Sequence, residues 1–335
     1  MLIIYLILLI FFSFLLIKST EILIQALTNL SKISHIGKFA ITSSLLALAT
    51  SLPELFVGIT AALEKQSNLA LGNVLGSNIA NISLVIGGAA LIGGSIGVVG
   101  NFLKKDIFYA FLAGAFPLLL LLDGRLSRVE GLILLLVYGI YNYTVLLEKK
   151  REKYSSGEIA RKILRRLNHK GTEGQIAWIF LGAVLLVFSA DGIVKVAGLI
   201  AQSFKVPVFL VGLFLVAIGT SLPELSFEIG AIRKKQVGMV FGDLLGSITA
   251  NSTLILGVTA LINPMVLEGG FRPYLWATIA YFLIFILFWV FVRTKKKLER
   301  WEGIVLLLIY IAFIIFEFWR INQSPASILF SQPIH

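Results

Sequence analysis

Long apolar stretches constrain this chain more than any other feature of its sequence. Runs of about 20 apolar residues can cross a bilayer as α-helices, and they recur along most of the 335 residues. Because lipid offers no hydrogen-bond partners, a backbone inside it must be helical or closed into a barrel. Only 14% of the residues are charged, whereas soluble domains average about 25%. We therefore predict an all-α integral membrane protein embedded in the lipid bilayer.

The apolar stretches predict ten transmembrane helices. They lie near residues 2–29, 38–63, 69–93, 107–122, 129–147, 175–201, 207–232, 238–263, 273–292 and 302–320. The polar segment 149–174 separates the fifth stretch from the sixth, which divides the chain into 1–148 and 175–335. The first stretch lacks the basic start and the small-residue cleavage site of a signal peptide. We therefore interpret it as the first transmembrane helix.

The two halves of the chain carry copies of one sequence motif. Shifting the sequence by 170 residues aligns 49–87 with 219–257 without a gap, and 18 of the 39 positions are identical, including polar and glycine positions. Shared hydrophobicity alone does not produce such a match. With five helices in each half, the second copy enters the membrane in the opposite orientation. The sequence therefore predicts two five-helix repeats of inverted topology.

The basic residues predict the orientation of the chain. One set of alternate loops contains 21 Lys and Arg residues, and the other set contains 6. Because cytoplasmic loops are enriched in Lys and Arg, the basic loop 149–174 is predicted to be cytoplasmic and both termini extracellular, in a multi-pass protein of the cell (plasma) membrane. Apolar residues at helical spacing between 159 and 167 predict a short amphipathic helix there, either on the membrane surface or as a solvated linker.

Composition excludes several classes of protein. The chain has no cysteine, which rules out disulfides and thiolate metal sites. Its histidines, His35, His169 and His335, lie in predicted loops or at the terminus, which argues against a zinc enzyme. No Gly-rich phosphate loop is present, so we expect no cofactor and no step driven by ATP. The net charge of +11 is that of the loops, and we expect no nucleic-acid partner.

Each copy of the motif places a carboxylate inside an apolar stretch. Glu54 and Glu224 both end the sequence Thr-Ser-Leu-Pro-Glu. A charge at the centre of a membrane helix costs about 2.5 to 3.5 kcal/mol, so two such charges indicate a function. Pro53 and Pro223 have no N–H to donate to the carbonyl four residues earlier. We therefore expect the helix to open in the preceding turn and free backbone oxygens. The expected openings are at 47–50 and 217–220.

Hydroxyl and amide side chains follow in the next stretch. They recur every four residues and form one polar stripe, which consists of Asn73, Ser77 and Asn81. Gly72 and Gly76 have the spacing that lets a second helix approach closely. Carbonyl, hydroxyl, amide and carboxylate oxygens are the hard donors that Ca²⁺ takes. The two motif copies therefore predict a central cation site lined with oxygen atoms.

These motifs resemble the paired alpha repeats of the sodium/calcium exchangers, a family of the cation/calcium exchanger superfamily. The resemblance rests on 50–54 with 72–81 and on their copies at 220–224 and 242–251. It implies a secondary active antiporter that exchanges Ca²⁺ for Na⁺ by alternating access at a shared central site. The metal ligands that it implies are side chains of Ser51, Glu54, Ser77, Asn81, Ser221, Glu224, Ser247 and Asn251, and backbone oxygens of Ala47, Thr50, Ala217 and Thr220.

The second copy departs from the family pattern. Asn251 occupies a position that is Asp in some members, and Asp243 stands where Asn is more frequent. Glu228 has no acidic counterpart in the first copy, where Gly58 stands. In the predicted topology both extra acids lie on the cytoplasmic side of the central site. There they form either an accessory cation vestibule or an element that takes up protons, unless Glu228 simply pairs with the basic cluster that begins at Arg233.

Three other functions remain open at this point. A Ca²⁺/H⁺ antiporter, or one for another cation pair, keeps the same fold, because a desolvated carboxylate binds a proton readily. A cation channel is a second alternative, against which the inverted repeat argues. An intramembrane aspartyl protease would need glycine where Val240 stands, so we expect no enzyme. In the first and sixth helices, we expect salt bridges among Lys18, Glu21, Asp191 and Lys195.

Overall fold

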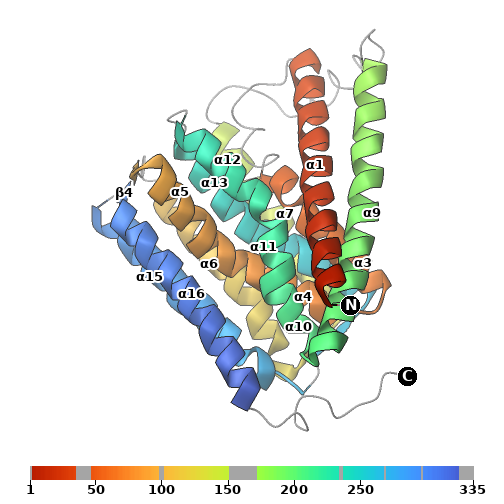
Figure 1. The fold of residues 1–335 in the computed structure, drawn as a ribbon. Coiled ribbons are helices and arrows are strands. Elements are labelled where there is room, and N and C mark those ends of the chain that lie inside the picture. The colour runs from red at the N-terminus through yellow and green to blue at the C-terminus, as the bar shows by residue number, and fades with distance from the viewer. Residues whose placement is uncertain are drawn as a thin grey trace.

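The structure is a computed structural model of the chain, and it describes residues 2–34, 47–97, 102–150, 172–233, 237–267, 269–295 and 297–323. Helices form almost all of it (Figure 1). Part of the second predicted stretch and the amphipathic helix predicted within 159–167 lie outside the described residues.

Eight helical segments in the described part of the chain are long and apolar enough to cross a membrane: Ile3–Leu23, Ser67–Gly93, Asp106–Asp123, Ala177–Phe204, Val208–Arg233, Gly238–Ile262, Arg272–Thr294 and Arg300–Arg320. They correspond to eight of the ten predicted stretches. The second stretch contributes the shorter apolar helix α3 (Leu52–Leu63), and the fifth forms α7 (Arg128–Lys150), which is not among the eight. An all-helical membrane protein is thus confirmed, whereas the ten-helix count stays a prediction.

Two long helices stand side by side at one edge of the molecule. They are α1 (Leu2–Ser34) and α9 (Thr172–Phe204), which pack along each other (Figure 1). The predicted salt bridges are present, each within one helix: Lys18 Nζ lies 2.7 Å from Glu21 Oε2, and Lys195 Nζ lies 2.9 Å from Asp191 Oδ1. The pairing offsets charges that these apolar helices would otherwise carry alone.

Broken helices fill the centre of the molecule. In the first half they are α3, α4 (Ser67–Ala80), the π-helical turn η1 (Asn81–Val85) and α5 (Ile86–Gly93). In the second half they are α10 (Val208–Leu210), π-helical η3 (Val211–Val216), α11 (Ala217–Thr220), α12 (Leu222–Arg233), α13 (Val237–Thr249), π-helical η4 (Ala250–Ile255) and α14 (Leu256–Ile262). The two halves interlock here, because α4 packs against η3, α10 and α11, and α3 packs against α14.

The remaining elements surround this centre. They are α6 (Phe102–Leu120), α7, α15 (Leu275–Lys295), α16 (Arg300–Gln323) and the 3-10 turns η2 (Leu121–Asp123) and η5 (Arg272–Tyr274). The start of α7 is fixed by a capping box, in which Ser127 N–H donates to Glu130 Oε2 at 2.7 Å and Glu130 N–H donates to Ser127 Oγ at 3.3 Å. In Figure 1, α15 and α16 lie at the edge opposite α1 and α9.

Two short antiparallel strand pairs join loops of the two halves. Strand β1 (Ile96–Gly97) pairs with β4 (Lys297–Leu298), and β2 (Arg125–Leu126) pairs with β3 (Met265–Val266). The apolar stretches of the sequence predict helices alone. Two-residue strands between distant loops leave no periodic pattern in the sequence, so they were not predicted.

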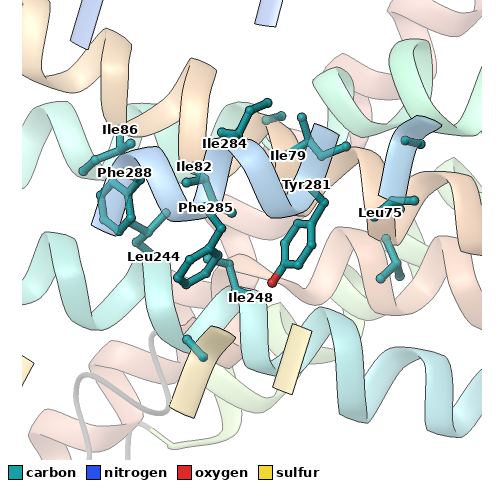
Figure 2. Packing of buried hydrophobic residues seen from close by; sticks show 14 of the residues in the cluster. Leu75, Ile79, Ile82, Ile86, Leu244, Ile248, Tyr281, Ile284, Phe285 and Phe288 are labelled. Carbon is teal, nitrogen blue, oxygen red and sulfur yellow. The ribbon is translucent and has the colours of Figure 1, made fainter. Parts of the chain in front are cut away.

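The largest apolar core lies between three parts of the molecule: the segment formed by α4, η1 and α5, the helix α13, and the helix α15. Figure 2 shows Ile79 and Ile82 meeting Tyr281 and Phe285 of α15, with Ile248 of α13 beside them. All five side chains are fully buried. This packing fixes α4 and α13, the two helices that carry the predicted polar stripe and its copy.

The close approach predicted from Gly72 and Gly76 is confirmed. A side chain at Gly72 would collide with the backbone oxygen of Phe209, and one at Gly76 would collide with that of Leu213. The backbones of α4 and η3 therefore touch where no side chain fits between them. This contact presses α4 of the first half against the second half at the level of the two motif copies.

Candidate functional site

The helix that carries each Pro-Glu motif is interrupted, one residue later than expected. Residues 47–50 and 217–220 stay helical, and the interruption falls at Ser51 and Ser221, whose ψ angles are 7° and 2°. The N–H of Ser51 donates to Ala47 O at 3.1 Å, and that of Ser221 donates to Ala217 O at 3.0 Å. The expectation that the helix opens at 47–50 and 217–220 was therefore wrong, and the carbonyls of Ala47 and Ala217 each accept one backbone N–H. A proline cannot donate to the carbonyl four residues back, and the irregular residue lies two positions before each proline.

The predicted ligands are all buried in one central region. None of them is more than 2% exposed: Ala47, Thr50, Ser51, Glu54, Ser77, Asn81, Ala217, Thr220, Ser221, Glu224, Ser247 and Asn251. The accessory acids Glu228 and Asp243 are also fully buried. Such a concentration of polar groups in an apolar protein costs free energy unless each group is hydrogen-bonded or paired with a charge.

One junction joins the first Pro-Glu motif to α13. Thr50 Oγ1 donates to Asp243 Oδ1 at 2.8 Å and lies 3.4 Å from Ser247 Oγ. Asp243 and Ser247 are four residues apart in α13 and therefore project from the same face of the helix. Residues separated by almost 200 positions in the sequence thus meet at the site.

The matching junction joins the second motif to α4. Thr220 Oγ1 donates to Asn73 Oδ1 at 3.1 Å and lies 3.3 Å from Ser77 Oγ. Ser77 Oγ also lies 3.3 Å from Glu54 Oε1, to which it donates. Under the 170-residue shift, Thr220, Asn73 and Ser77 correspond to Thr50, Asp243 and Ser247. The two junctions therefore have the same construction, with an amide acceptor in one and a carboxylate in the other.

Amide side chains link the two polar stripes directly. Asn251 Nδ2 donates to Asn78 Oδ1 at 3.2 Å, and Asn78 Nδ2 donates to Ser252 Oγ at 2.7 Å. These bonds hold α4 against η4. Asn251 Oδ1 takes no part in them and has no donor among the described residues.

A π-helical turn begins at or just before each predicted amide ligand. The turn η1 starts at Asn81, and η4 starts at Ala250, one residue before Asn251. π-helical turns inside α-helices occur frequently at functional sites, because the wider turn changes the direction of the side chains that follow. Because the two π-helical turns occur at equivalent places in both halves, they are not a chance irregularity of one helix.

Many oxygen atoms at the centre have no hydrogen-bond partner among the described residues. They are Ser51 Oγ, Glu54 Oε2, Asn81 Oδ1, Ser221 Oγ, both carboxylate oxygens of Glu224, and Asn251 Oδ1. Buried polar atoms are normally paired, and each exception calls for an explanation. Six residues of the predicted ligand set supply these oxygens, and hydroxyl, amide and carboxylate oxygens are the donors that a hard cation takes. The arrangement therefore fits the binding of such a cation.

The carboxyl groups at the centre influence one another. Glu224 lies close enough to Glu54, Asp243 and Glu228 to be repelled by each of them when they are ionised. A cation placed among them would relieve this repulsion. Within the described part of the chain, however, no three acidic or histidine side chains converge closely enough to hold a metal by themselves. Hydroxyl, amide and backbone oxygens would have to complete any coordination shell.

The structure adds residues that the sequence analysis did not place in the site. Asn73 and Asn78 both form hydrogen bonds between the two halves. Asn73 lay in the predicted polar stripe, and its spacing of four residues from Ser77 could have identified it. Glu228 does not pair with Arg233, because neither of its carboxylate oxygens has a partner among the described residues. The other members of the predicted basic cluster, Lys234 and Lys235, lie outside the described residues.

The fold and the site together define a membrane transport protein with a buried, oxygen-lined centre made from two similar motifs. A family model described as sodium/calcium exchanger protein matches residues 4–147 and 174–319, and the chain belongs to this family. The members of this family are transporters of the exchanger type.

Individual relatives support the same placement. The chain is 32% identical to the inner membrane protein YrbG of Escherichia coli over 253 residues, 75% of this chain and 77% of the relative. It is 26% identical to the sodium/calcium exchanger MaX1 of Methanosarcina acetivorans over 337 residues, covering 91% and 95% of the two chains. Among solved structures, the sodium-calcium exchanger NCX_Mj matches with a TM-score of 0.64 and 26% identity, covering 94% of this chain and 99% of that one.

Proposed function

We propose that the chain exchanges Ca²⁺ for Na⁺ across the cell membrane by alternating access at the site between the two motifs. One observation carries the proposal. Six of the residues that match the ligand positions of the family have buried carboxylate, hydroxyl or amide oxygens without a hydrogen-bond partner among the described residues: Ser51, Glu54, Asn81, Ser221, Glu224 and Asn251. Hydrogen bonds that are not made inside a protein cost about 1 to 3 kcal/mol per group, and more for charged groups. A bound cation supplies the missing partner.

The charges of the site match the proposed cargo. Glu54 and Glu224 together balance one Ca²⁺, and Ca²⁺ takes six to eight oxygen ligands, which the hydroxyl, amide and backbone oxygens of the two motifs complete. Several Na⁺ ions can use the same oxygens when Ca²⁺ is absent. Binding of one ion type excludes the other, and this competition is what an exchanger requires.

The two-fold construction of the site supports a transport mechanism over a channel. We propose ten transmembrane helices arranged as two five-helix repeats, 1–148 and 175–335, of opposite orientation. The matched junctions at Thr50 and Thr220, the equivalent π-helical turns and the 18 identical positions support this arrangement. In an inverted repeat, rocking one set of helices against the other exposes a central site first to one side and then to the other.

The counter-ion is tested by transport into proteoliposomes that contain the purified protein. We expect Ca²⁺ uptake when the vesicles are loaded with Na⁺ and diluted into Na⁺-free buffer, and none when a pH gradient alone is imposed. Uptake driven by the pH gradient and indifferent to Na⁺ would instead establish a Ca²⁺/H⁺ antiporter with the same fold.

The site is tested by replacing its central carboxylates. Removing one charged partner from a buried ionic site costs about 3 to 5 kcal/mol, so Glu54→Gln and Glu224→Gln should each weaken Ca²⁺ binding by roughly a hundredfold or more. Glu302→Gln is the matched control: its carboxylate is also buried, but it accepts the N–H of Glu299 at 2.8 Å, away from the site. Normal Ca²⁺ exchange by either central variant would refute the assignment.

The absence of cysteine makes the proposed orientation easy to test. A single cysteine introduced at Lys65, in the turn after α3, is expected to react with a membrane-impermeant maleimide added outside intact cells. A single cysteine at Lys162, within the loop 149–174, should react only after the cells are opened. The reverse pattern would show that the termini and this loop lie on the other sides.

A further inference from the structure

Two acids of the second half remain after the predicted ligands of the central site have been assigned. Glu228 lies in α12, one turn beyond Glu224, and Asp243 lies in α13, one turn before Ser247. The two helices pack against each other. Both side chains are fully buried, and the charge of Asp243 acts directly on the Glu228 carboxyl.

Three of their four carboxylate oxygens have no hydrogen-bond partner among the described residues. Both carboxylate oxygens of Glu228 and Oδ2 of Asp243 have no hydrogen-bond donor within the described ranges. Asp243 Oδ1 is occupied by the Thr50 hydroxyl. Two buried carboxylates that repel each other would destabilise this part of the fold if nothing neutralised them.

The first half cannot form an equivalent cluster. The position that matches Glu228 is Gly58, where an added side chain would lie 2.9 Å from Ile255 Cγ2 and 3.1 Å from Thr259 Oγ1. The position that matches Asp243 is Asn73, whose neutral amide accepts the Thr220 hydroxyl. The acidic pair is therefore a property of the second half alone and is not a consequence of the repeat.

We propose that Glu228 and Asp243 form a second cation site, adjacent to the central one, that binds a single Na⁺. The proposal rests on the proposed function, because it places this ion beside the exchange site. The pair offers three free carboxylate oxygens, far fewer than the six to eight that Ca²⁺ takes. A small monovalent cation needs fewer protein ligands, so Na⁺ suits the cluster better than Ca²⁺.

The test is the number of Na⁺ ions bound per molecule of the full-length protein in detergent, measured with ²²Na⁺, together with the affinity for ⁴⁵Ca²⁺ in Na⁺-free buffer. We expect Glu228→Gln to bind one Na⁺ fewer than the unmodified chain while it still binds Ca²⁺ saturably. Asp243→Asn should show the same loss. This variant should fold, because the matching position of the first half, Asn73, already holds an asparagine. Glu317→Gln, a buried acid of α16 whose partner is Arg320, is the matched control and should bind the full number of Na⁺ ions.

Two results would overturn the proposal. If Glu228→Gln binds as many Na⁺ ions as the unmodified chain, the carboxyl carries a proton and not Na⁺, because glutamine reproduces the shape of a protonated glutamate. If the variant loses Na⁺ and Ca²⁺ together, Glu228 belongs to the central site. Failure of the proposed function is distinguishable, because it would appear as absence of saturable Ca²⁺ binding in the unmodified chain.

Discussion

Replacing Gly76 by alanine tests whether the contact between α4 and η3 holds the site together. A β-carbon at this position would lie 2.7 Å from the carbonyl carbon of Leu213 and 2.7 Å from Ala217 Cβ, and closer still to the backbone oxygen of Leu213. Ordinary contacts between carbon atoms are about 3.5 to 4.0 Å. The two helices must therefore separate by about 1 Å to accept a single methyl group.

The cost can be estimated from the atoms involved. Overpacking a well-ordered core costs about 1 to 3 kcal/mol, and the upper end applies because the atoms met belong to rigid backbone and a short side chain. Alanine is better than glycine in a helix by about 1 kcal/mol, so we expect a net loss of about 2 kcal/mol. The movement also displaces Ala217 and Thr220, so Ca²⁺ affinity should fall as well.

The measurement is thermal unfolding in detergent followed by tryptophan fluorescence, together with ⁴⁵Ca²⁺ binding. Gly230→Ala is the matched control, because this glycine lies inside α12 and an added β-carbon meets nothing within 4 Å. The control should melt at or above the temperature of the unmodified chain, and Gly76→Ala should melt well below it. A Gly76→Ala variant as stable as Gly230→Ala would refute the argument that backbone contact between the halves is required.

Three further substitutions probe the polar groups of the molecule. Tyr281→Phe should stabilise the protein by about 1 kcal/mol, because this fully buried hydroxyl has no partner among the described residues; a lower melting temperature would contradict this. Thr220→Val should destabilise the protein by about 1 to 3 kcal/mol and weaken Ca²⁺ binding, because Asn73 Oδ1 loses its donor. Thr253→Val is the control: this hydroxyl donates to Thr249 O in the same helical segment, so its loss should leave Ca²⁺ binding unchanged. Glu21→Gln alone should lower the melting temperature more than Glu21→Gln combined with Lys18→Gln, because the single variant leaves the charge of Lys18 without its partner in α1. Equal melting temperatures for the single and double variants would show that the ion pair contributes nothing to stability.

Much of the fold could be predicted because membrane helices are local. A stretch of apolar residues forms its own hydrogen bonds, so its length and composition determine that it is helical. The salt bridges at Lys18 and Lys195 were predictable for the same reason, since their partners lie three and four residues away on one helix face. The two-residue strand pairs join loops far apart in the chain, and no local pattern encodes them.

The candidate site was predictable to the extent that it repeats. The gap-free match between the halves identified Thr50 and Thr220 as equivalent, and both form the same type of junction. What the repeat could not predict was the partner of each hydroxyl, because that depends on how the two halves face each other. Nor could it locate the helix interruption within one residue, since proline removes a donor but does not determine which neighbouring residue adopts the irregular conformation.

The junctions also show why the two halves of the site are not electrically equivalent. At one junction the Thr220 hydroxyl meets the neutral amide of Asn73, and at the other the Thr50 hydroxyl meets the carboxylate of Asp243. An ionised carboxylate and an amide oxygen both only accept hydrogen bonds, so the threonine hydroxyl donates at each junction, and the junctions differ in the charge of the acceptor. The second half adds negative charge as well, first from Asp243 and then from Glu228 one turn beyond Glu224. We therefore expect a cation to be held more tightly on the side of α12 and α13. The two openings of the site, which alternating access exposes in turn, should then differ in their affinity for cations.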